Sequence, residues 1–485
     1  MRHSRILLST LICVAVSHVA AALNSSAQNA NSQDAGAEGE IARRPNVIVI
    51  LTDDMGYADL GISGGEQILT PNIDRLVNDG VNFTNAYVTA SVCCPSRAGL
   101  LTGRYQQRFG HEFNNFAIPT EGYTQDDMGL SVDEQTIGNA FQDGGYATMC
   151  VGKWHMGGGE KFDPSQRGFD EVFAIEAGHR SYWPYTGEAR RANRIQISDD
   201  ELLPEEQVTY LTDDLTNAAV GFIERHQDEP FFIYLAYNAP HGPMHGKEAD
   251  EEFYNSISDQ RRRTYAAMMK ALDEGIGKVQ QTIADNGLAK HTLIVFTNDN
   301  GGATSNGSDN GPFRGMKGSK WEGGVRVPFS LTWHQNLPRG AAYELPVSTL
   351  DILPTSLAAA GIEYQGLPLD GVNLLPFIAD PESGLPHDAL FWRRGVAAAV
   401  RMGDWKLIRV EGNPDLLFNL AADPGERNDV APDHPEKVVT LKKCLAEWEG
   451  QLAPPKWTEG EKWSRNQVLK HQMHIQTRQQ ERKYP

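Results

Sequence analysis

Four stretches of the chain are continuous runs of apolar residues, and polar residues follow each run at once. Branched and aromatic side chains fill these runs without alternation, which is typical of strands buried on both faces of a sheet. The expected strands cover residues 46–51, 146–151, 231–237 and 292–296. Each of them therefore ends in side chains that could act as ligands, acids or bases.

Helical patterns separate these strands. Residues 72–79 and 136–143 are short helix candidates, while 211–226 and 259–286 have the apolar spacing of amphipathic helices. This alternation predicts an α/β fold with a large, mainly parallel sheet flanked by helices. Because open sheets of this kind bind ligands outside the carboxyl ends of their strands, we expect the polar segments to converge there.

The pattern changes from about residue 390 onward. Short strand-like runs at 396–400, 405–410 and 416–419 precede a helix over 435–450, which predicts a small C-terminal α+β subdomain with an antiparallel sheet. We expect a catalytic domain over residues 44–385 and the subdomain over 386–455. Residues 456–485 carry seven Lys and Arg against three Glu, so we expect this charged tail to be a solvated arm.

The first 27 residues have the pattern of a signal peptide. Arg2 and Arg5 precede an apolar run over residues 6–19, and three alanines follow it. The run is too short and too interrupted for a membrane anchor, so we expect export to a periplasm or to the outside. The alternative is a buried helix, which the polar segment after it does not favour. Residues 28–43 are expected to be a disordered lead-in.

The composition and charge of the chain exclude some classes of function. The 485 residues are 40% hydrophobic, enough for a sizeable core, and the formal charge is −19. That charge argues against nucleic-acid binding, which requires a basic face. An anionic substrate would need a local cationic site. Five cysteines, with Cys13 inside the leader, are too few for the disulfide framework of an exported protein this size.

The most informative stretch is residues 91–104, Ser-Val-Cys-Cys-Pro-Ser-Arg-Ala-Gly-Leu-Leu-Thr-Gly-Arg. Pro95 fits the first turn of a helix, which would place Cys93 just outside the helix N-terminus. The free N–H groups and dipole there stabilise negative charge, and Arg97 adds a cation. Read alone, a cysteine such as Cys93 is more often an inert buried residue than a nucleophile, because cysteine is among the most buried residue types.

Cys93-x-Pro95-Ser96-Arg97, followed by Leu101-Thr102-Gly103-Arg104, resembles the signature of the sulfatase family, formylglycine-dependent and arylsulfatase-like. The resemblance implies an alkaline-phosphatase-like fold. It also implies that a formylglycine-generating enzyme oxidises Cys93 to formylglycine, whose hydrate is the nucleophile. Cys94 occupies the variable position of the motif.

Two polar doublets at strand ends are candidate metal ligands: Asp53-Asp54 and Asp299-Asn300. All four side chains offer hard oxygen atoms, which select Ca²⁺ or Mg²⁺, and exported proteins meet abundant Ca²⁺. The same four residues match the calcium ligands of sulfatases. The resemblance therefore implies one Ca²⁺, with the group at position 93 as a further ligand.

Other motifs supply the remaining expected catalytic groups. Lys153 and His155 match the family's Gly-Lys-Trp-His element, His241 its Pro-His strand end, and Lys317 its Gly-x-Lys-Gly loop. In this interpretation Arg97, Lys153 and Lys317 neutralise the sulfuryl charge and Asp299 accepts the nucleophile's proton. His241, with Lys317, protonates the leaving oxygen, and His155 assists release of sulfate.

The sequence thus predicts an exported, calcium-dependent sulfatase acting on a sulfated small molecule or glycan. The resemblance covers residues 46–450 and favours a sulfated carbohydrate. His179 and Arg180 are candidate substrate contacts, because they follow a segment near the expected site. Two alternatives stay open: a phosphonate or phosphate-ester hydrolase of the same superfamily, and a non-catalytic sulfate-binding homologue.

Overall fold

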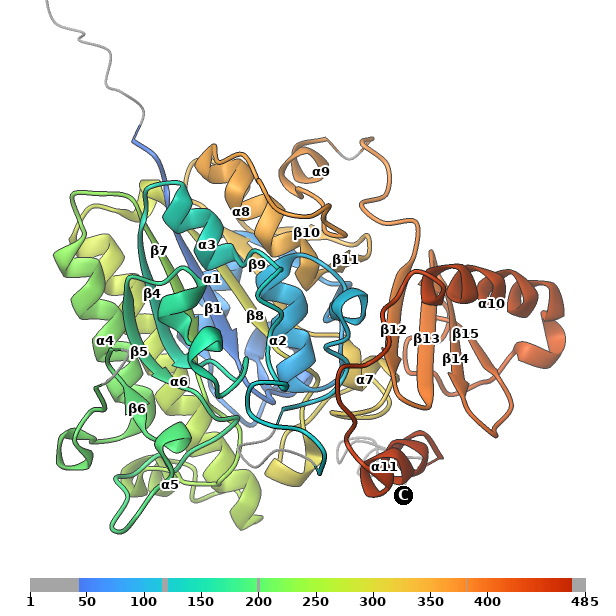
Figure 1. Ribbon diagram of the computed structural model, residues 1–485, viewed down its shortest axis with the longest axis horizontal. Coiled ribbons are helices and arrows are strands. Elements are labelled where there is room, and N and C mark those ends of the chain that lie inside the picture. Colours follow the sequence, from blue (N-terminus) through green and yellow to red (C-terminus); the bar gives the residue numbers. More distant parts are fainter. Residues whose placement is uncertain (1–42, 116–120, 199–200, 381, 473–485) are drawn as a thin grey trace, which may run out of the picture. The chain divides into compact units, whose positions relative to one another are not determined.

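The computed structural model describes residues 43–115, 121–198, 201–380 and 382–472 (Figure 1). The expected signal peptide, and all but the last residue of the expected lead-in, lie outside these residues. Within the described ranges, no helix is long and apolar enough to cross a membrane.

Nine strands of the described chain form one central sheet in the order β10-β2-β9-β8-β1-β7-β4-β5-β6. The four predicted strands lie side by side at its centre: β8 (Thr292–Asn298), β1 (Asn46–Thr52), β7 (Phe231–Ala236) and β4 (Ala147–Lys153). All three pairings among them are parallel. The remaining strands are β2 (Val81–Phe83), β5 (Glu171–Ile175), β6 (Ile195–Gln196), β9 (Phe329–Thr332) and β10 (Ala341–Tyr343).

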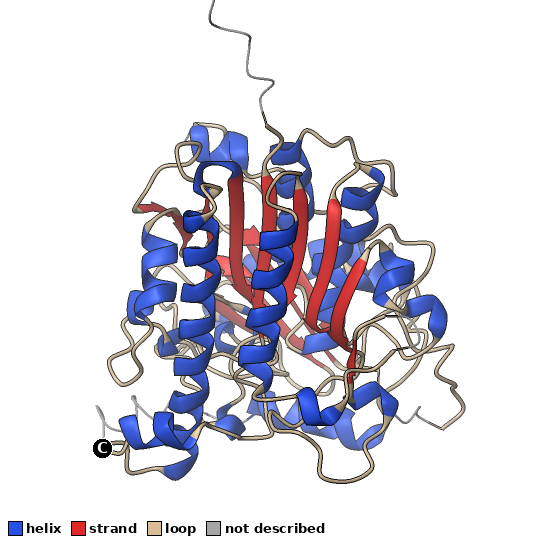
Figure 2. Ribbon diagram, turned by 90° about the vertical axis from the view of Figure 1, so that its left-hand side faces the viewer, coloured by secondary structure: helices blue, strands red, loops and turns tan. Residues whose placement is uncertain are grey.

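Both faces of this sheet are covered, because alternate residues of β1 enter two different cores. Ile48 and Ile50 pack on one side, whereas Val47, Val49 and Leu51 pack on the other. Figure 2 shows two long helices lying over one face of the sheet. The first core includes α1 (Pro71–Asn78), α4 (Leu211–Arg225) and α6 (Gln260–Asp285); the second includes α2 (Cys93–Thr102), α3 (Ile137–Asp143) and α8 (Ile352–Ala360).

The small C-terminal sheet is antiparallel, with the order β12-β13-β14-β15. It contains β12 (Leu390–Arg394), β13 (Ala397–Met402), β14 (Trp405–Val410) and β15 (Leu416–Asn419), and α10 (Pro435–Glu449) packs against it. Strand β12 was not among those predicted from the sequence. The shorter elements are β3 (Ala86–Tyr87), β11 (Val347–Ser348), α5 (Glu248–Phe253), α7 (Glu322–Val325) and α9 (Leu375–Ala379).

The predicted fold class is confirmed. The sheet is large and mostly parallel, helices flank it, and a small antiparallel sheet with a helix follows. The four helices predicted in the catalytic domain begin and end within two residues of α1, α3, α4 and α6. The division near residue 385 stays a prediction.

The expectation of a solvated C-terminal arm is wrong for residues 457–472. Trp457 is fully buried against Phe113 and Met128, and α11 (Glu461–Gln472) follows it, at the lower right of Figure 1. The number of charged residues wrongly suggested a solvated segment, because polar groups of this segment have partners inside the protein. Arg394 pairs with Glu459, and the buried ring of His471 accepts a hydrogen bond from the Lys320 amide at 2.9 Å.

Trp457→Ala tests whether this segment is part of the folded core. The indole stacks edge-on against His111 with ring centroids 4.7 Å apart, and its Nε1 donates to the Asn114 carbonyl at 3.0 Å. We expect the free energy of unfolding to fall by about 3–5 kcal/mol, the usual cost of truncating a buried aromatic residue. Chemical denaturation measures it, with Leu469→Ala on exposed α11 surface as the control. An equally small effect of both changes would show that the segment is not part of the core.

Candidate functional site

The polar residues that follow the central strands meet at one edge of the sheet. Asp53 and Asp54 follow β1, Lys153 ends β4 and His155 comes two residues later. His241 lies beyond the end of β7, and Asp299 and Asn300 follow β8. The backbone joins these loops, since the Asp53 amide donates to the Ala239 carbonyl at 3.1 Å and the Asp299 amide to the Thr52 carbonyl at 3.0 Å.

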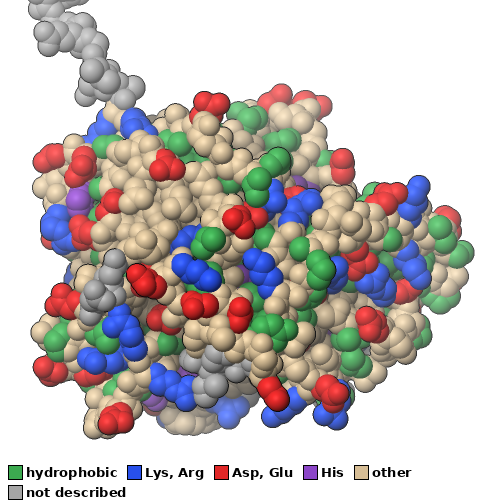
Figure 3. Space-filling view, in the orientation of Figure 1, with side chains coloured by type: hydrophobic (Ala, Val, Ile, Leu, Met, Phe, Trp, Pro, Cys, Tyr) green, Lys and Arg blue, Asp and Glu red, His purple; other side chains and the backbone are tan. Residues whose placement is uncertain are grey.

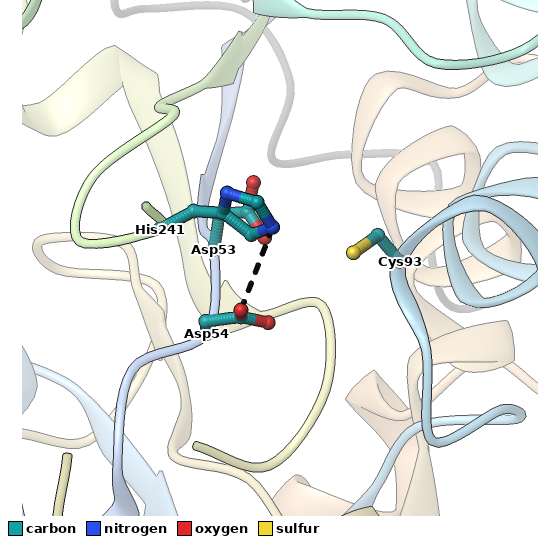
Figure 4. Close-up of side chains that lie close together, drawn as sticks. All are labelled: Asp53, Asp54, Cys93 and His241. Atoms are coloured by element: carbon teal, nitrogen blue, oxygen red, sulfur yellow. Dashed lines mark ion pairs between the residues drawn. The ribbon is translucent and has the colours of Figure 1, made fainter. Parts of the chain in front are cut away.

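Cys93 faces this edge from the other side of the site. In Figure 4 its side chain projects from α2 toward Asp53, Asp54 and His241. The structure makes Cys93 the first residue of α2, after the extended Val92, whereas sequence analysis placed it just outside the helix. Pro95 lies in the first turn as expected, and every residue of α2 is buried. The Lys317 amino group donates to the Cys93 sulfur at 3.0 Å.

The environment of the Cys93 thiol favours an anion. Burial raises its pKa, but the charges of Lys153 and Lys317 and hydrogen bonds from His155 and His241 hold that pKa well below its ordinary value. A group at this position is therefore surrounded by donors and cations.

Cys94 has a different environment. Its sulfur lies 2.9 Å from Nε2 of His111, away from the cationic groups, and burial raises the pKa of the thiol to about 12. The two adjacent thiols are chemically alike, so the difference between their pKa values comes from their positions in the structure. Cys93, Cys94, Cys150 and Cys444 are free thiols in the described chain.

Three buried carboxylates and three buried cations surround the Cys93 side chain. Asp53 pairs with Lys153 at 2.6 Å, Asp54 with Lys317 at 2.6 Å, and Asp299 with Arg97 at 2.9 Å. Such a cluster is stable only when each charge is offset, because burial of an unpaired charge is costly.

The pKa values of the three carboxyl groups respond differently to this environment. Burial raises the pKa of Asp53 and of Asp54, yet the charges of Lys153 and His241 beside Asp53, and of Lys317 and His241 beside Asp54, hold both below their usual range. For Asp299, burial and the charge of Asp53 outweigh Arg97, and its pKa lies well above its usual range.

The oxygen atoms of this cluster fit a cation. Two buried oxygens, Oδ1 of Asp53 and Oδ1 of Asn300, have no hydrogen-bond partner within the described chain. Ligand atoms of Asp53, Asp54, Cys93 and His241 lie within 4.8 Å of one another, so the cluster is a candidate metal site. Unpartnered buried oxygens are costly unless an ion or water satisfies them, and this donor set suits a hard divalent cation.

Two histidines flank the cluster in different states. Burial lowers the pKa of His155 to about 4, and its Nδ1 has no partner among the described residues. His241 lies 2.6 Å from the Gly242 carbonyl through Nδ1 and 3.6 Å from Asp54 through Nε2. Although burial lowers the pKa of His241, the charges of Asp53 and Asp54 together outweigh it, and this pKa lies above its ordinary value. His241 is therefore the better proton donor of the two.

The loop that carries Lys317 is fixed by backbone contacts. The Lys317 amide donates to the Gly302 carbonyl at 3.1 Å and the Gly318 amide to the Ser91 carbonyl at 2.7 Å. Gly318 has a left-handed φ of 87°, and a Cβ there would lie 2.7 Å from Nζ of Lys470. Glycine at this position allows the loop and α11 to approach closely.

A cavity of about 460 Å³ opens beside Cys93. His155, His179, His241 and Lys317 line it together with Cys93. Arg180, by contrast, does not line this cavity: it is fully buried and pairs with Glu205 at 3.0 Å. Of the two candidate substrate contacts, only His179 is therefore placed to meet a ligand here.

Sequence analysis missed other residues that line the cavity. They are Asn114, Asn115, Tyr185, Glu188 and Arg190. These side chains lie on irregular segments, where no periodic pattern or strand-end position identifies them. On the face drawn in Figure 3, acidic and basic side chains are interspersed.

Comparison with known proteins identifies close relatives. Residues 45–362 match the family model for sulfatases. The chain is 34% identical to human (Homo sapiens) N-acetylgalactosamine-6-sulfatase, with 84% of this chain and 86% of that protein aligned. It is 31% identical to bovine (Bos taurus) arylsulfatase A, with 87% of this chain and 92% of that protein aligned.

A solved structure is also similar over most of its length. The crystal structure of Ps i-CgsB superposes with a TM-score of 0.80 at 34% identity, covering 88% of this chain and 98% of that chain. The same protein has been solved in complex with k-i-k-neocarrahexaose.

Proposed function

The chain belongs to the sulfatase family and is a sulfuric ester hydrolase, and we propose that it removes sulfate from a carbohydrate with a formylglycine derived from Cys93 as its nucleophile. The observation that carries this proposal is the position of Cys93. It opens on the cavity at 3.0 Å from the Lys317 ammonium group, and it lies close to Asp53 and Asp54, whose oxygens belong to the candidate metal site. Formylglycine supplies an oxygen nucleophile and an aldehyde carbon from which sulfate can be expelled.

We propose one Ca²⁺ as the metal, held by Asp53, Asp54, Asp299 and Asn300, with the group at position 93 as a further ligand. The unpartnered oxygens of Asp53 and Asn300 support this assignment. When bound, the ion supplies positive charge that lowers the pKa of a nearby hydroxyl group and offsets negative charge on the sulfuryl oxygens.

The chain's own residues perform the proton transfers. Asp299 accepts the proton of the attacking hydroxyl group, while Arg97, Lys153 and Lys317 stabilise charge on the sulfuryl oxygens. His241, with Lys317 beside it, donates a proton to the leaving alcohol oxygen as the S–O bond breaks. His155 then accepts a proton from the second hydroxyl group at position 93. The bond between the carbon that carries this group and the sulfate oxygen breaks, so sulfate leaves and the aldehyde is restored. The low pKa of His155 leaves its imidazole free to accept that proton.

The proposal of a carbohydrate substrate is supported by the relatives and by the cavity. Human N-acetylgalactosamine-6-sulfatase is named for a sulfated sugar, and Ps i-CgsB binds a carrageenan oligosaccharide. Polar and charged side chains, among them Asn114, Glu188 and Arg190, line the cavity of this chain and suit a hydroxylated, anionic ligand.

Maturation and location complete the proposal. A formylglycine-generating enzyme would read Cys93-x-Pro95-Ser96-Arg97, and the signal peptide expected over residues 1–27 would direct export to a periplasm or to the outside.

The function is tested with a matched pair of substrates and a matched pair of cysteine variants. We expect turnover of 4-nitrophenyl sulfate to exceed that of an aryl phosphonate ester. Cys93→Ala should lower the sulfate activity by at least about 1000-fold because it removes the nucleophile. Cys94→Ala should retain activity within about threefold, since Cys94 packs away from the cavity.

Peptide mass spectrometry of active enzyme, made in a host that contains the modifying enzyme, should detect the aldehyde or its hydrate at position 93. Full activity with an unmodified Cys93, or an aldehyde at position 94, would contradict the mechanism. Faster hydrolysis of the phosphonate would instead favour the phosphonate-hydrolase alternative.

The calcium assignment is tested by Asp54→Ala. This change removes an anionic oxygen ligand, so we expect bound calcium to fall below about a tenth of the wild-type stoichiometry. Metal analysis after dialysis measures the content, and the rise in melting temperature on adding calcium should disappear. Asp213→Ala, which removes a partner of Lys247 outside the site, is the control and should keep both properties. Stoichiometric calcium in Asp54→Ala would exclude Asp54 as a ligand.

The acid role of His241 is tested with leaving groups of different quality. A sugar sulfate has a poor leaving group and needs protonation, whereas 4-nitrophenyl sulfate does not. We expect His241→Ala to lose at least about tenfold more kcat/KM on the sugar sulfate than on the aryl sulfate. His245→Ala, a nearby histidine that does not line the cavity, should change both rates by the same factor. Equal losses for His241→Ala would remove it from the acid role.

A further inference from the structure

A second cavity meets the first at the catalytic centre. Its volume is about 430 Å³, and both cavities share three lining residues: Asn114, His241 and Lys317. The first cavity extends toward His155 and His179, while the second extends toward Gly242–Met244 and α11. Each volume lies within the range of about 300–1,000 Å³ that is typical of ligand pockets. His241, the proposed leaving-group acid, therefore lies between the two cavities, and each cavity extends away from it.

One wall of the second cavity comes from α11. Trp463, Asn466, Gln467 and Lys470 line it, and their spacing of three and four residues places them on one face of the helix. The Trp463 side chain is 45% exposed although tryptophan is usually well buried. An exposed aromatic face beside amide groups is the surface on which the apolar face of a sugar ring can pack.

The charge of this wall suits an anionic ligand. In the described chain no carboxylate lies within ion-pair distance of Lys470, whose amino group instead donates to the Lys317 carbonyl at 2.7 Å. Arg394 lines the same cavity. Glu459 already pairs with Arg394, so Lys470 is the cation of this wall that has no ion-pair partner among the described residues. A sulfate group on a neighbouring sugar unit would give it a partner.

From these observations we propose that the substrate is a glycan chain that occupies both cavities, so that the scissile sulfate lies on an internal sugar unit. In this arrangement α11 binds the adjoining unit through Trp463 and Lys470. This inference rests on the proposed function, because it places the sulfated unit at Cys93. An enzyme specific for a terminal unit would need one side of the catalytic centre closed, and the described residues leave a cavity on each side.

The experiment compares sulfated oligosaccharides of increasing length, from disaccharide to hexasaccharide. Three series are used, derived from carrageenan, chondroitin sulfate and heparin, with 4-nitrophenyl sulfate as the small reference. Tandem mass spectrometry locates the sulfate that is lost. We expect loss from internal units in at least one series, with kcat/KM rising at least about tenfold from disaccharide to hexasaccharide, which corresponds to about 1.4 kcal/mol of added binding.

Trp463→Ala supplies the residue-level test. We expect its kcat/KM on the hexasaccharide to fall about tenfold more than its kcat/KM on 4-nitrophenyl sulfate, because the reference does not reach α11. Lys470→Gln should show the same bias, added to a loss on both substrates because Lys470 also contacts the Lys317 loop. Leu469→Ala, on the same helix but outside the cavity, should leave both rates as in the wild type.

The outcomes separate this inference from the function on which it rests. Loss of sulfate from terminal units only, rates independent of length, or equal losses in Trp463→Ala would overturn it. So would hydrolysis of 4-nitrophenyl sulfate with none of the three oligosaccharide series. If neither the aryl sulfate nor any oligosaccharide is hydrolysed by the mature enzyme, the proposed function itself fails.

Discussion

The structure depends on the mutual compensation of six charges buried at the carboxyl edge of the sheet. Asp53, Asp54 and Asp299 would be strongly unfavourable there by themselves, and so would Arg97, Lys153 and Lys317. Because these charges come from the ends of β1, β4 and β8, from α2 and from the Lys317 loop, the cluster exists only when all of these elements are in place. The residues that stabilise an anion in the site can therefore come together only in the complete fold.

The same constraint explains which residues could be predicted from sequence. Strands β1, β4, β7 and β8 are buried on both faces, so each shows an uninterrupted apolar run, and the change to polar residues at its end is visible. Because parallel strands end at the same edge of a sheet, the strand pattern alone predicts that these polar ends lie close together. The two doublets, Lys153, His155 and His241 all follow from that rule, while Cys93 and Lys317 required the motifs.

The rest depends on contacts between residues far apart in the chain. Asn114 and Arg190 lie on irregular segments with no periodic signal. Arg180 follows a suggestive segment but turns into the protein to meet Glu205. In α11 the misleading signal was charge, because a count of Lys and Arg does not reveal that Lys470 donates to the Lys317 carbonyl or that Glu459, in the same segment, pairs with Arg394.

The packing of α11 against the Lys317 loop also has a consequence for biosynthesis. Because synthesis runs from the N-terminus, the segments of the central sheet emerge before Trp457, Lys470 and His471, which follow the last strand of that sheet in the chain. The nascent chain can therefore acquire its acidic cluster well before the wall that completes the second cavity. Binding of a long substrate would therefore be the later property to form, after the charged cluster is already in place.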